Sequence, residues 1–209
     1  MVGEYPFSPK LAVRALKRCD PQLARAVDRV GPFRLELHTA ATPFQMLVRS
    51  IVHQQLSGQA ARAIEARLTA LFPHRPTAAR VLAISPDVLR NVGLSKAKVL
   101  AVKALAAHAL GGGVPTRRRL ERMSDAEIAA CLTQIRGVGR WTVDMLLIFY
   151  LARPDVLPVT DLGIRKGLMH VYQMRRLPTP QETARTGETW RPYRSVASWY
   201  LWRSLDHPA

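Results

Sequence analysis

The chain has few cysteines, few acidic residues and no long apolar run. Two cysteines among 209 residues, Cys19 and Cys131, exclude a disulfide framework, a four-cysteine zinc site and an iron–sulfur cluster. No apolar run approaches the roughly 18 to 20 residues of a membrane-spanning helix, and the first ten residues lack a signal-peptide core. We therefore expect a cytoplasmic protein without a membrane partner, in which both cysteines are buried small apolar residues.

Acidic residues are the scarce charge. The chain has 15 Asp and Glu against 31 Lys and Arg, a formal net charge of +16, while its 48% hydrophobic content is ordinary for a globular protein. Such self-repulsion is expected of a protein that binds a polyanion, above all a nucleic acid. An arginine-rich composition bias is the alternative, but it does not explain the scarcity of acids. The basic residues are spread along the chain, so we expect the basic surface to belong to the fold.

Helix starts are marked repeatedly by a capping residue followed by proline. The capping oxygen accepts a hydrogen bond from an orphan backbone N–H, and proline at the first helical position loses no needed hydrogen bond. With apolar residues at helical spacing, these signals predict an all-α fold of about ten helices. Phe33–His38 alternates like a strand but is too isolated to build a sheet. The cap–proline pairs are Ser8-Pro9, Asp20-Pro21, Thr42-Pro43, Ser85-Pro86 and Thr179-Pro180, with capping boxes at Ser124–Glu127 and Thr179–Glu182.

A very tight turn is predicted between residues 127 and 141. A helix over 127–135 precedes Arg136-Gly137-Val138-Gly139-Arg140, and a second helix begins near Trp141. Both glycines permit positive φ, while Val138 can anchor the turn in the core. Backbone N–H groups around the two glycines then point outward, where they can hold a phosphate. A plain helix–helix connection is the alternative.

Asp161 follows Pro158 and Thr160 at the point where another helix should begin. A carboxylate there caps the helix and is favoured by the helix dipole. Taken alone, this residue needs no function beyond capping.

Four stretches together resemble the helix-hairpin-helix–GPD superfamily of DNA glycosylases, and within it the 3-methyladenine DNA glycosylase II type. The resemblance spans about residues 40 to 205. It implies an all-α, two-lobed helical fold with DNA in a cleft between the lobes, one formed by residues 41–156 and the other by 1–40 and 157–209. The stretches are Leu132–Asp144 (LTQIRGVGRWTVD), Leu157–Gly167 (LPVTDLGIRKG), Phe44–Ala61 for the early helix pair, and Trp190–Trp202 for the C-terminal helix.

The resemblance implies a monofunctional glycosylase that hydrolyses the N-glycosidic bond of alkylated bases, of the 3-methyladenine and 7-methylguanine type, in double-stranded DNA. Asp161 would be the catalytic carboxylate, which stabilises positive charge on the deoxyribose and orients the attacking water. The competing acids Asp144 and Asp155 are expected to be structural. Strand-nicking members carry a lysine where this chain has Trp141, so water is the expected nucleophile.

Trp141, Trp202 and Met145 are the expected base pocket. Trp202 matches a family aromatic that faces the extruded base, and an electron-rich indole attracts a cationic methylated purine. Trp199, on the same helix, is the alternative. Met145 departs from the family pattern, which usually has aromatics there, and so leaves open an enzyme for ethenoadenine or N1-methyladenine. A non-catalytic helix-hairpin-helix module that only binds DNA is the other alternative.

The expected partner is damaged double-stranded DNA, bound by a monomer that needs no obligate protein partner and that would be nucleoid-associated in a bacterium. Gln55 matches the family's wedge position, with Leu56 beside it, and Ser95-Lys96 is a second phosphate contact. No cofactor is expected for catalysis, although the resemblance implies Na⁺ or K⁺ on the backbone carbonyls of Thr133, Ile135 and Gly137. The expected DNA contacts are Gln54, Gln55, Ser95, Lys96, Gly137, Gly139, Arg140 and Thr142.

Overall fold

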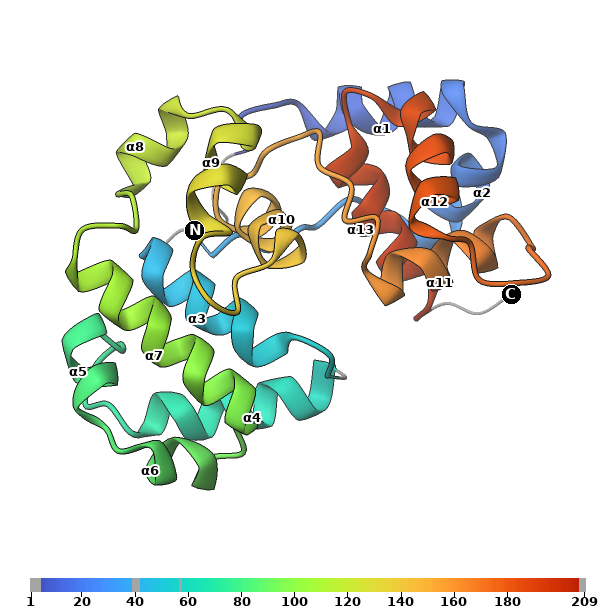
Figure 1. The fold of residues 1–209 in the computed structure, drawn as a ribbon. Helices are drawn as coiled ribbons and strands as arrows, with labels where there is room; N and C mark the ends of the chain where they lie inside the picture. Colours follow the sequence, from blue (N-terminus) through green and yellow to red (C-terminus); the bar gives the residue numbers. More distant parts are fainter. Residues whose placement is uncertain (1–4, 39–41, 57, 207–209) are drawn as a thin grey trace. The chain divides into compact units, whose positions relative to one another are not determined.

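The computed structural model describes residues 5–38, 42–56 and 58–206, and these residues form an all-helical fold (Figure 1). They contain thirteen α-helices and one short 3₁₀-helix, with no strand, so the all-α prediction is confirmed. Residues 33–38 are extended but unpaired. The estimate of about ten helices was too low because three helices of six residues each are too short to show a periodicity. None of the helices described is long and apolar enough to span a membrane.

The chain divides into two compact units, residues 38–146 and residues 1–37 with 147–209. Of the two boundaries expected from the sequence, the one at residue 41 lies outside the described residues. The other, at residue 156, lies further along the chain than the division between Leu146 and Leu147.

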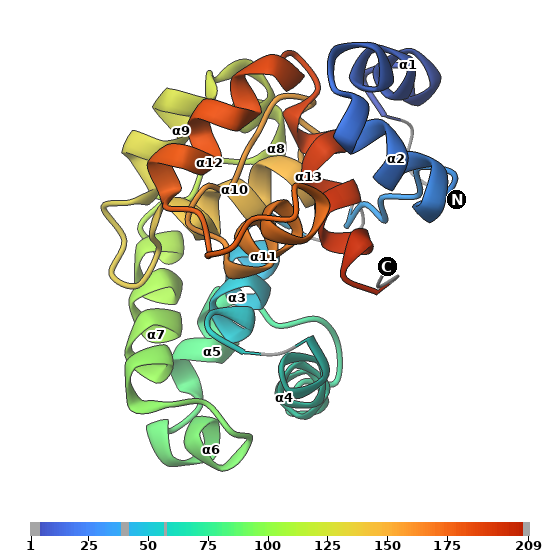
Figure 2. The same ribbon diagram turned by 90° about the vertical axis from the view of Figure 1, so that its right-hand side faces the viewer.

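In the 38–146 unit, a long central helix, α7, packs against α3 and α5 (Figures 1 and 2). The contact is apolar: Leu47 and Ile51 of α3 and Val102 and Leu105 of α7 are fully buried. The helices of this unit are α3 (Pro43–His53), α4 (Gly58–Ala70), α5 (Ala78–Ala83), α6 (Pro86–Asn91), α7 (Lys96–Leu110), α8 (Arg117–Arg122), α9 (Asp125–Leu132) and most of α10 (Arg140–Phe149).

In the other unit, α13 packs against α11 and α2, so the two ends of the chain share one core (Figure 2). Gly167 allows the close approach of α11 to α13, because a Cβ there would lie 2.3 Å from the Leu201 carbonyl oxygen. The helices are α1 (Pro9–Cys19), α2 (Pro21–Val30), α11 (Leu162–Val171), α12 (Pro180–Gly187), the 3₁₀-helix η1 (Glu188–Trp190) and α13 (Arg194–Ser204).

All five cap–proline helix starts and both predicted capping boxes are confirmed. The sequence analysis missed a third capping box, in which the Gln45 N–H donates to Thr42 Oγ1 and the Gln45 side chain accepts from the Thr42 N–H. The burial expected for the cysteines is wrong for Cys19, which is exposed because it is the last residue of a surface helix; Cys131 is half-buried.

Asp20 is a buried carboxylate that joins three elements. Its Oδ1 caps α2 by accepting from the Gln22 and Leu23 N–H groups at 3.0 and 2.9 Å. Its Oδ2 accepts from Trp190 Nε1 at 2.7 Å and from the Tyr172 hydroxyl. Burial and the neighbouring carboxylate together raise the pKa of Tyr172. Asp20 therefore holds the start of α2 to η1 and to the end of α11.

We expect Asp20→Ala to lower the free energy of unfolding by about 3 kcal/mol or more, because it removes a cap and leaves the buried Trp190 donor without an acceptor. Urea denaturation followed by circular dichroism measures this loss. Asp28→Ala is the control: its carboxylate pairs with Lys17 on the surface, with side chains 65% and 41% exposed, so we expect a change below about 1 kcal/mol. Equal losses in the two variants would contradict the role given to Asp20.

Candidate active site and nucleic-acid interface

Asp161 is the N-cap residue of α11, as predicted. Its Oδ1 accepts from the Ile164 N–H at 2.8 Å and from Trp202 Nε1 at 2.9 Å. One donor belongs to the helix that Asp161 begins and the other to α13. Since two rigid elements each aim an N–H at the same oxygen, the orientation of this half-buried carboxylate is fixed.

Trp202 is the tryptophan of α13 that lies beside Asp161. Its ring also stacks on Phe149, with centroids 5.7 Å apart and an interplanar angle of 27°. Trp199, by contrast, is buried and packs edge-on against Phe33 and Tyr200. Of the two tryptophans left open by the sequence, the structure therefore places Trp202 next to the acid and Trp199 in the core.

The sequence analysis missed Phe149. It lies four residues after Met145 in α10, so the two side chains share a helix face. Met145 itself is buried, and the half-buried Trp141 lies in the first turn of the same helix. The family pattern usually has an aromatic residue at position 145. An aromatic residue one helical turn later was the sequence signal that could have identified Phe149. That Trp141 and Met145 contact a base stays a prediction.

Gly163 makes room for the contact between Asp161 and Trp202. A Cβ at this position would lie 2.9 Å from Trp202 Cδ1 and 3.0 Å from Asp161 Oδ1. The first distance is shorter than real Cβ atoms show and the second is tighter than most real Cβ contacts, so close approach rather than backbone conformation favours glycine here.

The predicted tight turn joins α9 to α10. Gly137 has φ +83°, and Val138 is buried, as expected. A Cβ on Gly137 would lie 2.2 Å from the Ala101 Cβ of α7. The lack of space is therefore a second reason, besides the positive φ, why this residue is glycine. The positive φ expected at Gly139 is wrong, because Gly139 already leads into α10 and its carbonyl accepts from the Val143 N–H. The first helix also ends earlier than predicted, at Leu132.

Two expected DNA-contacting side chains bind each other. Gln54 Nε2 donates to Thr142 Oγ1 at 2.8 Å and to the Gly137 carbonyl at 2.9 Å. Thr142 is only 1% exposed, so its hydroxyl is not available to a nucleic acid. For Thr142, only a contact between its backbone N–H and DNA stays a prediction.

The other expected DNA contacts lie at the surface of the 38–146 unit. Gln55, directly after α3, is exposed and has φ +54°, while Ser95 caps α7 and Lys96 is exposed in its first turn. Arg140 is exposed at the start of α10 and donates from Nε to Asp144 at 2.8 Å. These residues present basic and polar groups at helix ends, where a phosphate can be held; their contact with DNA stays a prediction.

The two competing acids are both engaged in ion pairs. Asp144 is 2% exposed, and its burial raises its pKa to about 6 even though Arg140 acts to lower it. Asp155 pairs with Arg191 and with Arg194, each at 2.7 Å. These contacts give each acid a structural role.

Carbonyl oxygens at the hairpin are the donor type expected for an alkali cation; that Thr133, Ile135 and Gly137 hold one stays a prediction. The Ile135 oxygen accepts from the Val138 N–H at 3.0 Å and the Gly137 oxygen accepts from Gln54. A carbonyl has two lone pairs, so each keeps one for a hard cation. In the part of the chain that is described, no group of three or more His, Cys, Asp or Glu residues could hold a metal.

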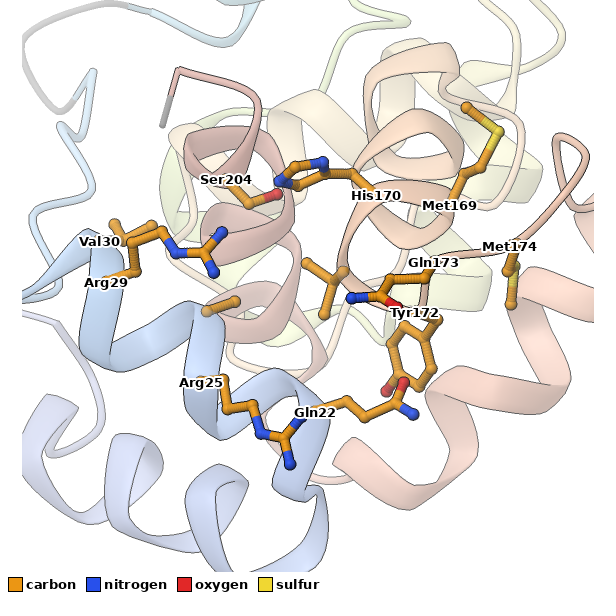
Figure 3. A pocket seen from close by; sticks show the side chains of 12 residues that line it. Gln22, Arg25, Arg29, Val30, Met169, His170, Tyr172, Gln173, Met174 and Ser204 are labelled. Atoms are coloured by element: carbon orange, nitrogen blue, oxygen red, sulfur yellow. The ribbon is translucent and has the colours of Figure 1, made fainter. Parts of the chain in front are cut away.

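A pocket of about 530 Å³ lies at the opposite end of α11 from Asp161 (Figure 3). Arg25 and Arg29 of α2 and Tyr172 and Gln173 at the end of α11 line it, together with Ser204 of α13. None of the residues predicted for the site lines this pocket.

We expect Gly163→Ala to push the Trp202 ring away from Asp161 and to destabilise the protein by about 1–3 kcal/mol through overpacking. Tryptophan fluorescence and urea denaturation measure the two effects. Gly139→Ala is the matched control, since a Cβ there meets nothing within 4 Å. A fluorescence spectrum for Gly163→Ala that matches the wild type would contradict the tight fit.

The raised pKa of Asp144 predicts a pH dependence of stability. The folded state binds this proton more tightly than the unfolded chain, whose aspartate pKa is about 3.9. The Asp144 contribution to stability therefore falls as pH rises through the window that ends near the folded value of about 6. We expect the free energy of unfolding of Asp144→Asn, relative to wild type, to rise across this window and then level off. Urea denaturation at stepped pH measures it; a constant difference would contradict the raised pKa.

The chain is similar to known proteins in both sequence and fold. The family model described as "HhH-GPD superfamily base excision DNA repair protein" matches residues 48–192. DNA-3-methyladenine glycosylase 1 of Schizosaccharomyces pombe is 35% identical over 192 residues, which cover 90% of this chain and 84% of that protein.

Two solved structures are similar over nearly the whole chain. The S. pombe 3-methyladenine DNA glycosylase Mag1, in complex with abasic DNA, has a TM-score of 0.91 at 35% identity and covers 93% of this chain and 96% of its own. The DNA-3-methyladenine glycosidase of Bacillus halodurans has a TM-score of 0.76 at 31% identity and covers 98% and 92%. With a family model that matches well over half of its residues, the chain belongs to the HhH-GPD superfamily of base excision DNA repair proteins.

Proposed function

We propose that this protein is a monofunctional DNA glycosylase that hydrolyses the N-glycosidic bond of alkylated bases, of the 3-methyladenine and 7-methylguanine type, in double-stranded DNA. The observation that carries the proposal is the Asp161 carboxylate, held by the Ile164 N–H and the Trp202 indole. The printed names of the relatives, 3-methyladenine glycosylases, support the same reaction.

The fixed carboxylate provides the chemistry that this reaction needs. Breaking the N-glycosidic bond builds positive charge on the deoxyribose, so an anion already held in place stabilises the transition state more than the ground state. The same carboxylate orients or deprotonates the attacking water. An N-alkylated purine that is already cationic leaves easily, so a second carboxylic acid is not needed to protonate it.

The neighbouring aromatic rings give a physical basis for choosing damaged bases. Trp202 and Phe149 form a stacked pair next to Asp161. An electron-rich ring attracts a cationic base more than a neutral one. Trp141 stands where strand-nicking members of the superfamily have a lysine, and so water is the nucleophile and an abasic site is the product.

The hairpin and the start of α7 would hold the DNA by its phosphates. Exposed basic and polar groups at Arg140, Ser95 and Lys96 and the backbone at Gly137 support this, as does the net charge of +16. The protein acts as a monomer and needs no cofactor for catalysis. Na⁺ or K⁺ on the carbonyls of Thr133, Ile135 and Gly137 would add a positive charge where a phosphate is held.

We expect Asp161→Asn to lower the rate of base release by at least about a thousandfold while duplex affinity stays within a few-fold of wild type. Release of 3-methyladenine and 7-methylguanine from methylated DNA, measured by chromatography, and duplex binding give the two values. Asp87→Asn, an exposed first-turn substitution in α6, is the control with unchanged release.

Other outcomes would overturn parts of the proposal. Release of ethenoadenine or N1-methyladenine without any 3-methyladenine or 7-methylguanine would overturn the proposed substrate class. Duplex binding without release of any base by the wild type would leave a non-catalytic DNA-binding module. Borohydride trapping of a protein–DNA adduct would contradict the monofunctional assignment.

A further inference from the structure

The end of α3 is closed by a lysine from another helix. The last carbonyls of a helix have no partner within it. Lys98, in the first turn of α7, donates from Nζ to the Val52 carbonyl at 2.8 Å and to the Gln54 carbonyl at 2.7 Å. The side chain is half-buried, and burial lowers its pKa. The end of α3 is thus bonded to α7.

Lys98 occupies a place that its own helix does not favour. A cation in the first turn opposes the dipole of α7, whereas a cation at the end of α3 is favoured by the dipole of that helix. Burial adds a desolvation cost. The two carbonyls at the end of α3 therefore account for the position of Lys98.

Gln54 connects the same point to the hairpin. Both hydrogens of its amide are used, one on the Gly137 carbonyl and one on Thr142 Oγ1. Its own carbonyl accepts from Lys98. We call Gln54, Lys98, Gly137 and Thr142 the Gln54 junction: it joins the end of α3, the start of α7 and the hairpin within one unit.

Gln55 and Leu56, which follow Gln54 in the chain, form an exposed and strained turn. Gln55 has φ +54°, a left-handed conformation that costs a side-chain-bearing residue about 1 kcal/mol. Its side chain is exposed, and Leu56 next to it is a large apolar side chain that is 39% exposed. Surrounding structure must hold such a turn in place, and the Gln54 junction is bonded to its first residue.

We propose that Lys98 and Gln54 are positioning residues for extrusion of the target base: they lock the turn Gln55–Leu56 to the hairpin. Phosphates held by the hairpin then determine where the turn meets the base stack. This inference rests on the proposed glycosylase function. Extrusion costs a few kcal/mol, less when the base is poorly paired. If the turn is loosened, the hairpin still binds DNA. Less of the binding energy then lowers the free-energy cost of extruding the base from the duplex.

Two substitutions test the junction, and the chain offers a matched control for each. Gln54→Glu keeps the shape but replaces the donor to the Gly137 carbonyl by an acceptor. Its control is Gln45→Glu in α3, because the Gln45 amide also donates to a distant carbonyl, that of Pro76. Lys98→Met removes the bonds to α3. Its control is Lys103→Met in the same helix, because Lys103 bridges the Leu82 and Ile84 carbonyls in the same manner.

The experiment compares two duplexes that differ only opposite the lesion. Single-turnover release of 7-methylguanine is measured with cytosine or an abasic site opposite it, together with duplex affinity. For Gln54→Glu and Lys98→Met we expect the rate on the paired lesion to fall by about tenfold or more, with a much smaller loss on the unpaired lesion. Duplex affinity should change by less than about threefold, and both controls should behave as wild type.

An equal loss of rate on both duplexes, or unchanged rates on both, would overturn the positioning role. Circular dichroism melts show whether each variant folds; if Lys98→Met does not, Gln54→Glu decides. If the wild type releases no base from either duplex, the proposed function itself fails and the positioning role fails with it. If the wild type is active and the variants keep its paired-to-unpaired ratio, only the positioning role fails.

Discussion

A single oxygen atom, Oδ1 of Asp161, accepts hydrogen bonds from two helices, and the geometry around the acid depends on that pair of bonds. One bond starts α11 and the other brings the Trp202 ring of α13 against the carboxylate. The second bond requires α11 and α13 to lie close together, which glycines permit at Gly163 beside the ring and at Gly167 beside the α13 backbone. Phe149 stacks on the indole ring. The site is therefore set by backbone spacing as much as by the acid itself.

Several of the scarce acidic residues stabilise the fold. Asp20 joins α2 to η1 and the end of α11, Asp144 pairs with Arg140, and Asp155 pairs with two arginines. Like Asp161, these carboxylates bind donors of the protein itself. Because the 15 acids can neutralise fewer than half of the 31 basic residues, the charge balance of the chain favours an anionic partner.

The sequence predicted what local chemistry determines. Capping residues, the cap role of Asp161, the positive φ of Gly137 and the burial of Val138 each follow from a residue and its immediate neighbours. Residue roles that depend on tertiary packing could not be predicted from the sequence. Trp199 and Trp202 are three residues apart in one helix, and only the tertiary contacts separate the core ring from the ring beside the acid. The partners of the Gln54 side-chain amide lie more than eighty residues away, so no spacing could indicate them.

The two donors on Oδ1 also determine how an amide would sit in place of the carboxylate. Both neighbours are N–H groups, so an asparagine would turn its oxygen toward them and its NH₂ group toward the position of the second carboxylate oxygen. The backbone and the Trp202 ring would then keep their places while the negative charge is lost. An inactive form with this preserved geometry is the suitable one for trapping the protein on an intact lesion, because the rest of the site has no reason to rearrange.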